Sequence, residues 1–552
     1  MKLYFSFYVT IGLLFFLFTS CKDAEPIPKD VKIVSVYPEY ITTHPRDAQR
    51  LKVSVKVNNI PQDSFKVIWS STNLKIAKVN EIGEVTFIAA GNASIIGIVN
   101  EKDTVKCEVN VTDENDYKFR VFLKDKGISG YSINRAEEFL SSKAIARRNK
   151  FNIPVNETDL PISSDYIMQI ENTGVVVIAK SKWLHTVTVS SSDIYIADKI
   201  KELPFVKDVV MVGQAIRNTQ KLDKFRIENN PNYKAVFNKS DIDTTYYGYA
   251  WNNIKVNNGQ ALHDLGFKGN GIDIADIDDG FFNIRTNTSL DNIKIKGAKS
   301  FIYEDKNPYV ENHGIWVLSC MAANKPGYFV GTAPDANYWL LRTEVVSSEY
   351  PVEEDYWVAA IEFADSAGVD IVNSSLSYYY HDGNTFQYKW EDMDGKTAMA
   401  TQGANIAFEK GIFIVNCAGN SSSWVGSPAD SPNVLTVGAI NKSGVIADFS
   451  SFGMTVDGRI KPDVVAMGGY PTAVISIYND YEFRFGTSYS SPIICGLVAC
   501  LWQAYPNLTN KQLLEIIRKS ADRYNNTVLP YGYGIPDMQK AMKLAQQLEA
   551  GF

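Results

Sequence analysis

Residues 485–496 read "FGTSYSSPIICG", a run of Gly, Thr and Ser that leads directly into an apolar segment. Small polar residues before Ile493, Ile494 and Leu497 predict a tight turn that opens a buried helix. A Ser or Thr in such a place commonly caps the helix. It can also serve as a nucleophile, because backbone N–H groups at a helix N-terminus stabilise a nearby oxyanion. The choice between these uses depends on whether the chain supplies a base, an acid and an oxyanion donor elsewhere.

The composition is that of a folded protein with several domains. The chain has 552 residues, of which 45% are hydrophobic and 21% charged, and this length predicts about three or four domains. The net charge of −7, without a Lys/Arg run, argues against a nucleic-acid partner. Five scattered cysteines without metal-ligand spacing predict buried free thiols: Cys107, Cys320, Cys417, Cys495 and Cys500.

The N-terminus has the pattern of a signal peptide that ends at a cysteine. An apolar run over residues 3–18 is short for a membrane span and suits the core of a signal peptide. It stops at Thr19-Ser20-Cys21, which resembles the lipidation site of bacterial lipoproteins. Residues 1–20 would then be the signal peptide, and residues 21–30 resemble the charged tether of some Gram-negative surface lipoproteins. Ordinary secretory cleavage, with Cys21 a bystander, is the alternative.

Residues 31–113 alternate between short apolar-polar strands and turns rich in Asn, Gly, Pro and Asp. This pattern is typical of a small β-sandwich. The stretch from Val67 to Ile95 resembles a bacterial Ig-like domain of the Big-2 type, with Trp69 as its core residue. Such domains act as spacers or adhesive modules, and we favour a spacer.

Residues 116–215 predict a different, mixed domain. The expected order is a strand at 117–123, a helix over 133–150, two strands over 174–189, a helix at 194–204 and a final strand at 206–212. That order approximates a ferredoxin-like α+β unit. The Asn- and Lys-rich residues 216–243 then have only weak patterning and read as a linker.

Residues 244–546 alternate continuous apolar strands with helices, which indicates a parallel α/β sheet covered on both faces. In such sheets, reactive groups gather at the C-terminal ends of the strands. Four polar residues fall at strand ends or helix starts, namely Asp278, His313, Asn420 and Ser488. Together they could form a nucleophile, a general base, an orienting carboxylate and an oxyanion donor.

The motifs around these four residues resemble those of the subtilisin-like serine peptidases. The matching blocks, in family order, are Asp278-Asp279-Gly280, His313-Gly314-Ile315, Ala418-Gly419-Asn420 and Gly486-Thr487-Ser488-Tyr489-Ser490-Ser491-Pro492. The resemblance extends over residues 246–544. It implies that Ser488 attacks the peptide carbonyl, His313 transfers the proton, Asp278 orients His313, and Asn420 binds the oxyanion. It also implies that Ser375-Leu376-Ser377 is the strand that binds the substrate.

Three residues depart from the family pattern. Asp279 places a second carboxylate beside Asp278, where it could stabilise a protonated His313 further or compete for it. Ile315 replaces a Thr and removes a hydroxyl at a helix start. Ser377 replaces a Gly on the substrate strand, where its Cβ could narrow the cleft. None of the three removes a group that the mechanism needs.

The sequence therefore predicts a serine endopeptidase that is lipid-anchored in the cell envelope. A catalytically degenerate subtilase that acts as a binding or adhesion module is the alternative. A different serine hydrolase is disfavoured, since no Gly-x-Ser-x-Gly turn is present. In the family, a ferredoxin-like domain in this position is an inhibitory propeptide, which would apply to residues 116–215; a permanent structural domain is the other reading.

The expected partners are protein or peptide substrates and, through the lipid on Cys21, the outer membrane or cell surface of a Gram-negative-type bacterium. We expect a monomer without a nucleic-acid partner. The mechanism needs no cofactor and predicts no metal ligands. Calcium stabilises many members of the family, but no acidic loop of the sequence is specific enough to name ligands for it.

Overall fold

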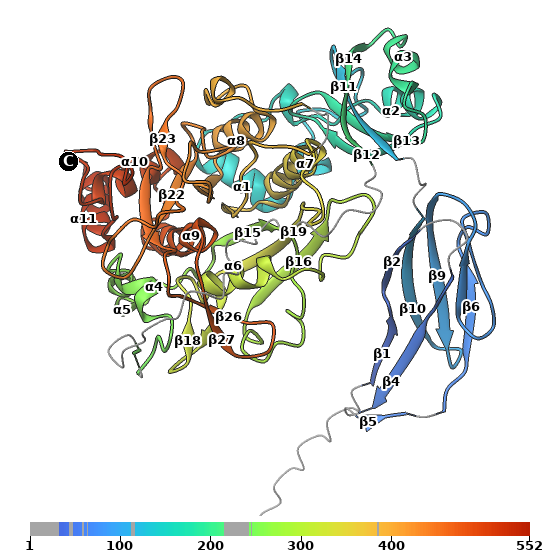
Figure 1. Ribbon diagram of the computed structural model, residues 1–552, viewed down its shortest axis with the longest axis horizontal. Helices are drawn as coiled ribbons and strands as arrows, with labels where there is room; N and C mark the ends of the chain where they lie inside the picture. Colours follow the sequence, from blue (N-terminus) through green and yellow to red (C-terminus); the bar gives the residue numbers. More distant parts are fainter. Residues whose placement is uncertain are drawn as a thin grey trace, which may run out of the picture.

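The computed structural model describes residues 32–43, 48–57, 60–62, 64–111, 116–214, 242–243, 245–382 and 386–551 (Figure 1). The predicted signal peptide, the tether with Cys21, and all of the predicted linker 216–243 except Ile242 and Asp243 lie outside these ranges. Within the described ranges, no helix combines the length and apolar character needed to cross a membrane.

The N-terminal domain consists of short strands in three small sheets, as the alternating pattern predicts. Strand β10 pairs with β9 antiparallel and with β2 parallel, and inward-facing Val85, Ile95 and Cys107 are fully buried. Trp69 is only partly buried and packs against the edge of this core, although the sequence predicted a core position. The strands are β1 (Lys32–Tyr37), β2 (Tyr40–Thr43), β3 (Ala48–Arg50), β4 (Lys52–Val57), β5 (Ile60–Pro61), β6 (Val67–Ser71), β7 (Ala77–Val79), β8 (Glu84–Phe87), β9 (Gly91–Val99) and β10 (Asp103–Val111).

The second domain has a four-stranded antiparallel sheet in the order β12-β13-β11-β14. Two helices cover one face of this sheet, where Ile170, Ile196 and Ile200 pack with Phe119 and Val189. The strands are β11 (Tyr117–Leu123), β12 (Val176–Ser181), β13 (Thr186–Ser191) and β14 (Val206–Gln214), and the covering helices are α2 (Ser164–Glu171) and α3 (Ile196–Lys201).

The helix predicted over residues 133–150 differs from the observed one in length and in place. A 3₁₀ turn, η1 (Ala136–Glu138), comes first, and α1 (Ser142–Lys150) begins where the Ser141 hydroxyl accepts the N–H of Ala144 at 3.2 Å. A second short 3₁₀ turn, η2 (Glu157–Asp159), follows. Helix α1 does not lie on the sheet of its own domain. It lies against the next domain, while α2, which the sequence did not predict, covers the sheet (Figure 1).

The third domain contains the predicted parallel sheet, with seven strands in the order β16-β19-β15-β20-β21-β22-β25. All their pairings are parallel. The strands are β15 (Asp273–Asp278), β16 (Lys294–Ser300), β19 (Asn337–Arg342), β20 (Ile371–Ser374), β21 (Phe413–Cys417), β22 (Leu435–Ile440) and β25 (Val464–Met467).

Helices cover both faces of this sheet, and β15, β20, β21, β22 and β25 are buried along their whole length, whereas the edge strand β16 is largely exposed. One face carries α7 (Val352–Ala367) and α8 (Met399–Glu409), and the other carries α6 (His313–Ala322) and α9 (Thr487–Ala504). All five described cysteines are buried free thiols, which confirms that prediction. Around this body lie α4 (Trp251–Lys255), α5 (Gln260–Asp264), α10 (Asn510–Ser520), α11 (Met538–Glu549), η5 (Trp390–Asp392) and the two-stranded pairs β17 (Asn324–Lys325) with β18 (Phe329–Val330), β23 (Gly453–Met454) with β24 (Ile460–Lys461), and β26 (Thr472–Ile475) with β27 (Tyr481–Arg484).

Candidate active site

Asp278 and His313 form a buried pair at the C-terminal end of the sheet. Asp278 is the last residue of β15 and His313 the first of α6, and His313 Nδ1 lies 2.7 Å from Asp278 Oδ1. The two residues are 0% and 1% exposed. The carboxylate therefore fixes the tautomer with the proton on Nδ1, which leaves Nε2 as the basic nitrogen. This is the arrangement that a histidine general base requires.

Ser488 is the second residue of α9 and is held through its own carbonyl. Pro492 stands four residues later in the helix and has no N–H to donate to that carbonyl. The Ser375 hydroxyl donates to the Ser488 carbonyl oxygen instead, at 2.8 Å. The missing helical bond is thus replaced by a bond to the predicted substrate strand, which fixes Ser488 relative to β20.

Asn420 lies three residues beyond β21 and contacts the turn just before Ser488. Its Oδ1 accepts hydrogen bonds from the backbone N–H and the hydroxyl of Thr487, both at 2.9 Å. The amide is therefore oriented with Nδ2 as its donor end. On the other side, the ring of Tyr489 lies 6.1 Å from the ring of His313, centre to centre. These contacts bring the start of α9 close to both Asn420 and the Asp278–His313 pair.

Asp279 does not compete for the ring of His313. Its carboxylate accepts the backbone N–H of Gly314 at 3.1 Å and that of His313 at 3.4 Å, so it caps the N-terminus of α6. Burial, and then the adjacent Asp278, raise the pKa of Asp279 well above its usual range. Ile315, which replaces a hydroxyl residue, is fully buried in the core. The cap that a helix-start hydroxyl could supply comes from Asp279 instead.

A second buried aspartate, which the sequence analysis missed, connects the strand of Asp278 to the helix of Ser488. Asn373 Nδ2 donates to Asp276 Oδ1 at 2.8 Å, and the Ser491 hydroxyl donates to Asn373 Oδ1 at 2.8 Å. Burial and Asp278 raise the pKa of Asp276 well above its usual value. The signal was present in the sequence, because residues two apart in a strand share a face and Asp276 precedes Asp278 by two.

The predicted substrate strand follows β20 directly. Ser375 and Leu376 are buried, and the next residue but one, Tyr378, exchanges two backbone hydrogen bonds with Ser427 at 2.8 and 2.9 Å. The Ser377 hydroxyl lies 3.2 Å and 2.6 Å from where a Cβ on Gly419 or Gly426 would stand. Ser377 therefore takes up the space between two glycines beside Asn420.

Two groups of side chains in the described ranges bring metal-ligating atoms within 4.8 Å of one another, namely Asp278 with Asp279 and His313, and Glu344 with Glu349 and Glu353. The first group is the paired and capping set described above. In the second, Glu353 accepts the N–H groups of Val345 and Tyr350, and Glu344 accepts the hydroxyl of Tyr378. These hydrogen bonds give the carboxylates of Glu353 and Glu344 partners within the protein.

Comparisons with known proteins agree with this site. Residues 261–535 match the model of the subtilase family, peptidase S8. Over 289 residues, which are 51% of this chain, it is 30% identical to subtilisin NAT of Bacillus subtilis subsp. natto, covering 68% of that protein, and 30% identical to subtilisin of Bacillus pumilus, covering 94% of it. The chain belongs to the subtilase family. It is a serine endopeptidase.

Other comparisons extend to the domains that precede the peptidase domain. Residues 30–109 match the bacterial Ig-like domain of group 2, and residues 118–228 match a peptidase S8 propeptide domain of Bacteroidota. The crystal structure of the epidermin leader peptide processing serine protease of Staphylococcus aureus superposes with a TM-score of 0.52 at 17% identity, covering 78% of this chain and 99% of that one. At this identity, the likeness concerns the fold alone.

Proposed function

We propose that this subtilase hydrolyses peptide bonds with Ser488 as nucleophile and His313 and Asp278 as its proton-transfer partners. The observation that carries the proposal is the contact of 2.7 Å between His313 Nδ1 and Asp278 Oδ1. This pair lies at the C-terminal end of the sheet, and Ser488 lies at the start of α9. The Ser488 hydroxyl attacks the substrate carbonyl and gives its proton to His313 Nε2. His313 then returns this proton to the leaving amine, and water releases the acyl group by the same route in reverse.

The developing oxyanion would be held by Asn420 Nδ2 and the backbone N–H of Ser488. The orientation of Asn420 by Thr487 supports this role, because a donor that is fixed before the reaction needs no reorganisation when charge develops. Substrate would extend along Ser375, Leu376 and Ser377. None of these steps requires a cofactor.

A fluorophosphonate probe tests the assignment directly. The probe labels only a serine that is activated as a nucleophile, so we expect one label on Ser488 and none in Ser488→Ala. A catalytically silent binding module, the other reading of the sequence, would give an unlabelled wild-type protein.

We also propose that Cys21 carries a lipid, which would place the enzyme at the outer membrane or cell surface of a Gram-negative-type bacterium, acting as a monomer. The apolar run before Cys21 and the charged residues after it support this location. Metabolic labelling with an alkyne fatty acid tests it, and a Cys21→Ser variant that still carries the label would refute it.

The domain of residues 116–214 is proposed to be a ferredoxin-like propeptide. The sheet order β12-β13-β11-β14 with α2 and α3 on one face, and the match of residues 118–228 to a peptidase S8 propeptide, support this role. At the end of β14, a Cβ on Gly213 would stand 3.4 Å from the Val352 side chain, which begins α7. The chain thus leaves this domain beside the catalytic domain. We propose residues 216–243 as the connecting segment that is cleaved on activation.

A further inference from the structure

Residues 141–159 of the second domain pack on the catalytic domain at the end of the sheet opposite the active site. The Ser141 N–H donates to the Ser366 carbonyl at 2.8 Å, just beyond which α7 ends. Lys143 Nζ lies 2.6 Å from Asp370 and 3.0 Å from Asp273, the residue that begins β15. Since Asp278 is at the other end of β15, residues 141–159 contact the end of the sheet where β15 begins.

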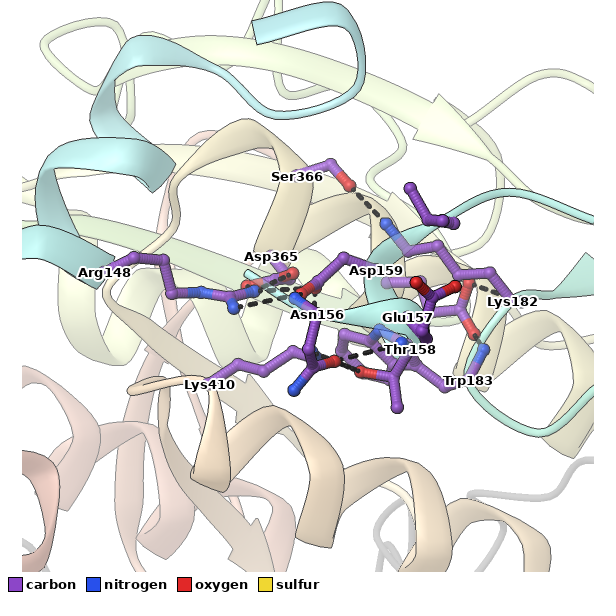
Figure 2. A network of polar contacts seen from close by, with 12 residues as sticks. Arg148, Asn156, Glu157, Thr158, Asp159, Lys182, Trp183, Asp365, Ser366 and Lys410 are labelled. Atoms are coloured by element: carbon purple, nitrogen blue, oxygen red, sulfur yellow. Dashed lines mark hydrogen bonds and ion pairs between the residues drawn. The ribbon is translucent and has the colours of Figure 1, made fainter. Parts of the chain in front are cut away.

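A buried cluster of five charges joins this segment to the catalytic domain. Figure 2 shows four of them, namely Arg148, Asp159, Asp365 and Lys410. Asp365 on α7 receives Arg147 Nη2 at 2.5 Å and Arg148 Nη2 at 2.8 Å. Asp159 receives Arg148 Nη2 at 3.1 Å and Lys410 Nζ at 2.7 Å. Every one of these side chains is at most 5% exposed. Both domains contribute to the cluster. Arg147, Arg148 and Asp159 come from the second domain, and Asp365 and Lys410 come from the catalytic domain.

Hydrogen bonds satisfy most of the polar atoms of the cluster, although the buried Arg148 Nε has no partner among the described residues. Its one excess positive charge is offset by backbone carbonyls, since Arg147 donates to the carbonyls of Val369 and Lys410. Although burial opposes its ionisation, Arg148 and Lys410 lower the pKa of Asp159 below its usual value. Removal of one partner from a buried pair of this kind is strongly destabilising, because it leaves the other charge without compensation.

Apolar contacts around the cluster are those of a protein core. Ile178, Trp183 and Val212 of the second domain are buried in the same cluster as Tyr356 and Trp357 of α7. At the other end of α1, the ring of Phe151 stacks on Trp502 with centroids 6.3 Å apart, and Ile153 lies against Gly411. Separation of the two domains would expose this apolar surface to water.

Two further carboxylates of α7 contact the second domain. Arg120 binds Asp355 in a bidentate pair at 2.8 and 2.7 Å, and Glu362 accepts the backbone N–H of Trp183 at 3.0 Å. Both contacts are buried. Carboxylates of α7 that water would solvate in a free catalytic domain are therefore paired with an arginine and a backbone N–H of residues 116–214.

We propose that residues 116–214 remain bound to the catalytic domain as a permanent, non-covalent subunit after the connecting segment is cut, with residues 141–159 as the clamp. The proposal rests on the proposed function only for the origin of the cut. Its consequence is that cleavage does not release the enzyme from the half of the chain that carries Cys21. The mature protein would be a two-chain peptidase that stays tethered.

The test uses the full chain with Ser488→Ala and with a recognition sequence for an unrelated site-specific protease inserted between residues 225 and 235. Cutting is brought about from outside and verified on a denaturing gel, so a lack of self-cleavage or of peptidase activity has no bearing on the result. We expect the two pieces to elute together on native size exclusion, and to stay together after dilution to nanomolar concentration. Separate elution of the pieces would overturn the proposal.

A pair of variants assigns the retention to the clamp. Arg148→Met keeps an unbranched apolar stem but removes the guanidinium between Asp159 and Asp365, and we expect the pieces to separate at least about a hundred-fold faster. Arg135→Met is the matched control, because Arg135 belongs to the same domain and pairs with Glu138 at the surface. Equal separation rates for both variants would refute the role of the cluster. If Arg148→Met does not fold, elution of the cut chain without this change still decides whether the pieces stay together.

Discussion

Asp279 Oδ1 accepts the backbone N–H of Gly314 at 3.1 Å, so a carboxylate 35 residues earlier in the chain caps the helix that begins with His313. We expect Asp279→Ala to lower the free energy of unfolding by about 1 kcal/mol, the usual loss for a helix cap, and to lower kcat more than it changes KM. Asp279→Ser, which restores a hydroxyl acceptor typical of the family, should recover both quantities. Denaturant titration and steady-state kinetics measure them, and an alanine variant equal to wild type would show that the cap is dispensable.

The site residues give the most direct prediction. We expect Ser488→Ala to abolish peptide hydrolysis and Asn420→Ala to lower kcat by about 10²–10³, the usual cost of losing one oxyanion donor. Asn292→Ala is a suitable control, because Asn292 is exposed and its amide donates to the carbonyl of Asn324, away from Ser488 in the sequence. Undiminished hydrolysis by purified Ser488→Ala would refute the assignment of Ser488 as the nucleophile.

Ser377 gives a prediction on specificity. Its hydroxyl lies between Gly419 and Gly426, where the family has no side chain on the substrate strand. We therefore expect Ser377→Gly to widen the range of residues cleaved, measured on a peptide library. Ser423→Gly removes a hydroxyl from a nearby exposed loop and should leave the cleavage profile unchanged. Identical profiles for wild type and Ser377→Gly would show that this hydroxyl does not limit the substrate.

The places of Asp278, His313 and Ser488 in the fold were predictable because each residue is tied to a local pattern. Asp278 ends a buried strand, His313 and Ser488 lie at the starts of apolar helices, and parallel strands bring their C-terminal ends to the same end of the sheet. The cap by Asp279 was not predictable in this way. It depends on the approach of two segments that only the folded chain brings together, and from the sequence alone its carboxylate read as a competitor for His313.

The packing of α1 against the catalytic domain could not be predicted from the sequence for a related reason. Residues 133–150 have helical periodicity, and periodicity shows which face is apolar but not against which domain that face packs. Arg147, Arg148 and Asp365 look like ordinary surface charges in the sequence, because charged residues are seldom buried unless they are paired. Their burial depends on partners in another domain, and no local pattern encodes this pairing.

Glu354 predicts a pH dependence of stability. It is fully buried, accepts the Tyr388 hydroxyl at 2.8 Å and the Ala400 N–H at 3.0 Å, and lies 3.8 Å from His381. Burial raises its pKa to about 7, against the opposing effect of Arg120. The folded state therefore holds this proton more tightly than the unfolded chain does. Its contribution to stability is complete below the ordinary carboxyl pKa and is lost as the pH rises to about 7.

We expect Glu354→Gln to remove this dependence, because the amide stays neutral at every pH. Between pH 4.5 and 7.5 the wild type should lose up to about 3 kcal/mol of unfolding free energy relative to the variant. Glu391→Gln, at an exposed position, is the control and should follow the wild type. Denaturant titrations across this range measure the difference, and parallel curves for wild type and Glu354→Gln would contradict it.

The segment between the second and third domains is the expected site of self-cleavage. Both of its ends are held, since Gly213 pairs with Lys118 in the sheet and the Asp243 carboxylate accepts the N–H groups of Thr245, Tyr246 and Tyr247. The sequence between them is only weakly patterned, as expected of a linker, and linkers are where proteases cut most readily. We therefore expect a cut between residues 215 and 241.

Dependence on Ser488 distinguishes self-cleavage from nicking by another protease. We expect intact-protein mass spectrometry to show two chains for wild type and one for Ser488→Ala, expressed and purified in the same way. A full-length chain in both, together with full activity of the wild type, would mean that residues 116–214 are a permanent part of an uncleaved enzyme. Two chains in both would assign the cut to a different protease. Because the clamp contacts the end of the sheet away from Ser488, we expect the cut to raise peptidase activity without loss of residues 116–214 from the purified enzyme.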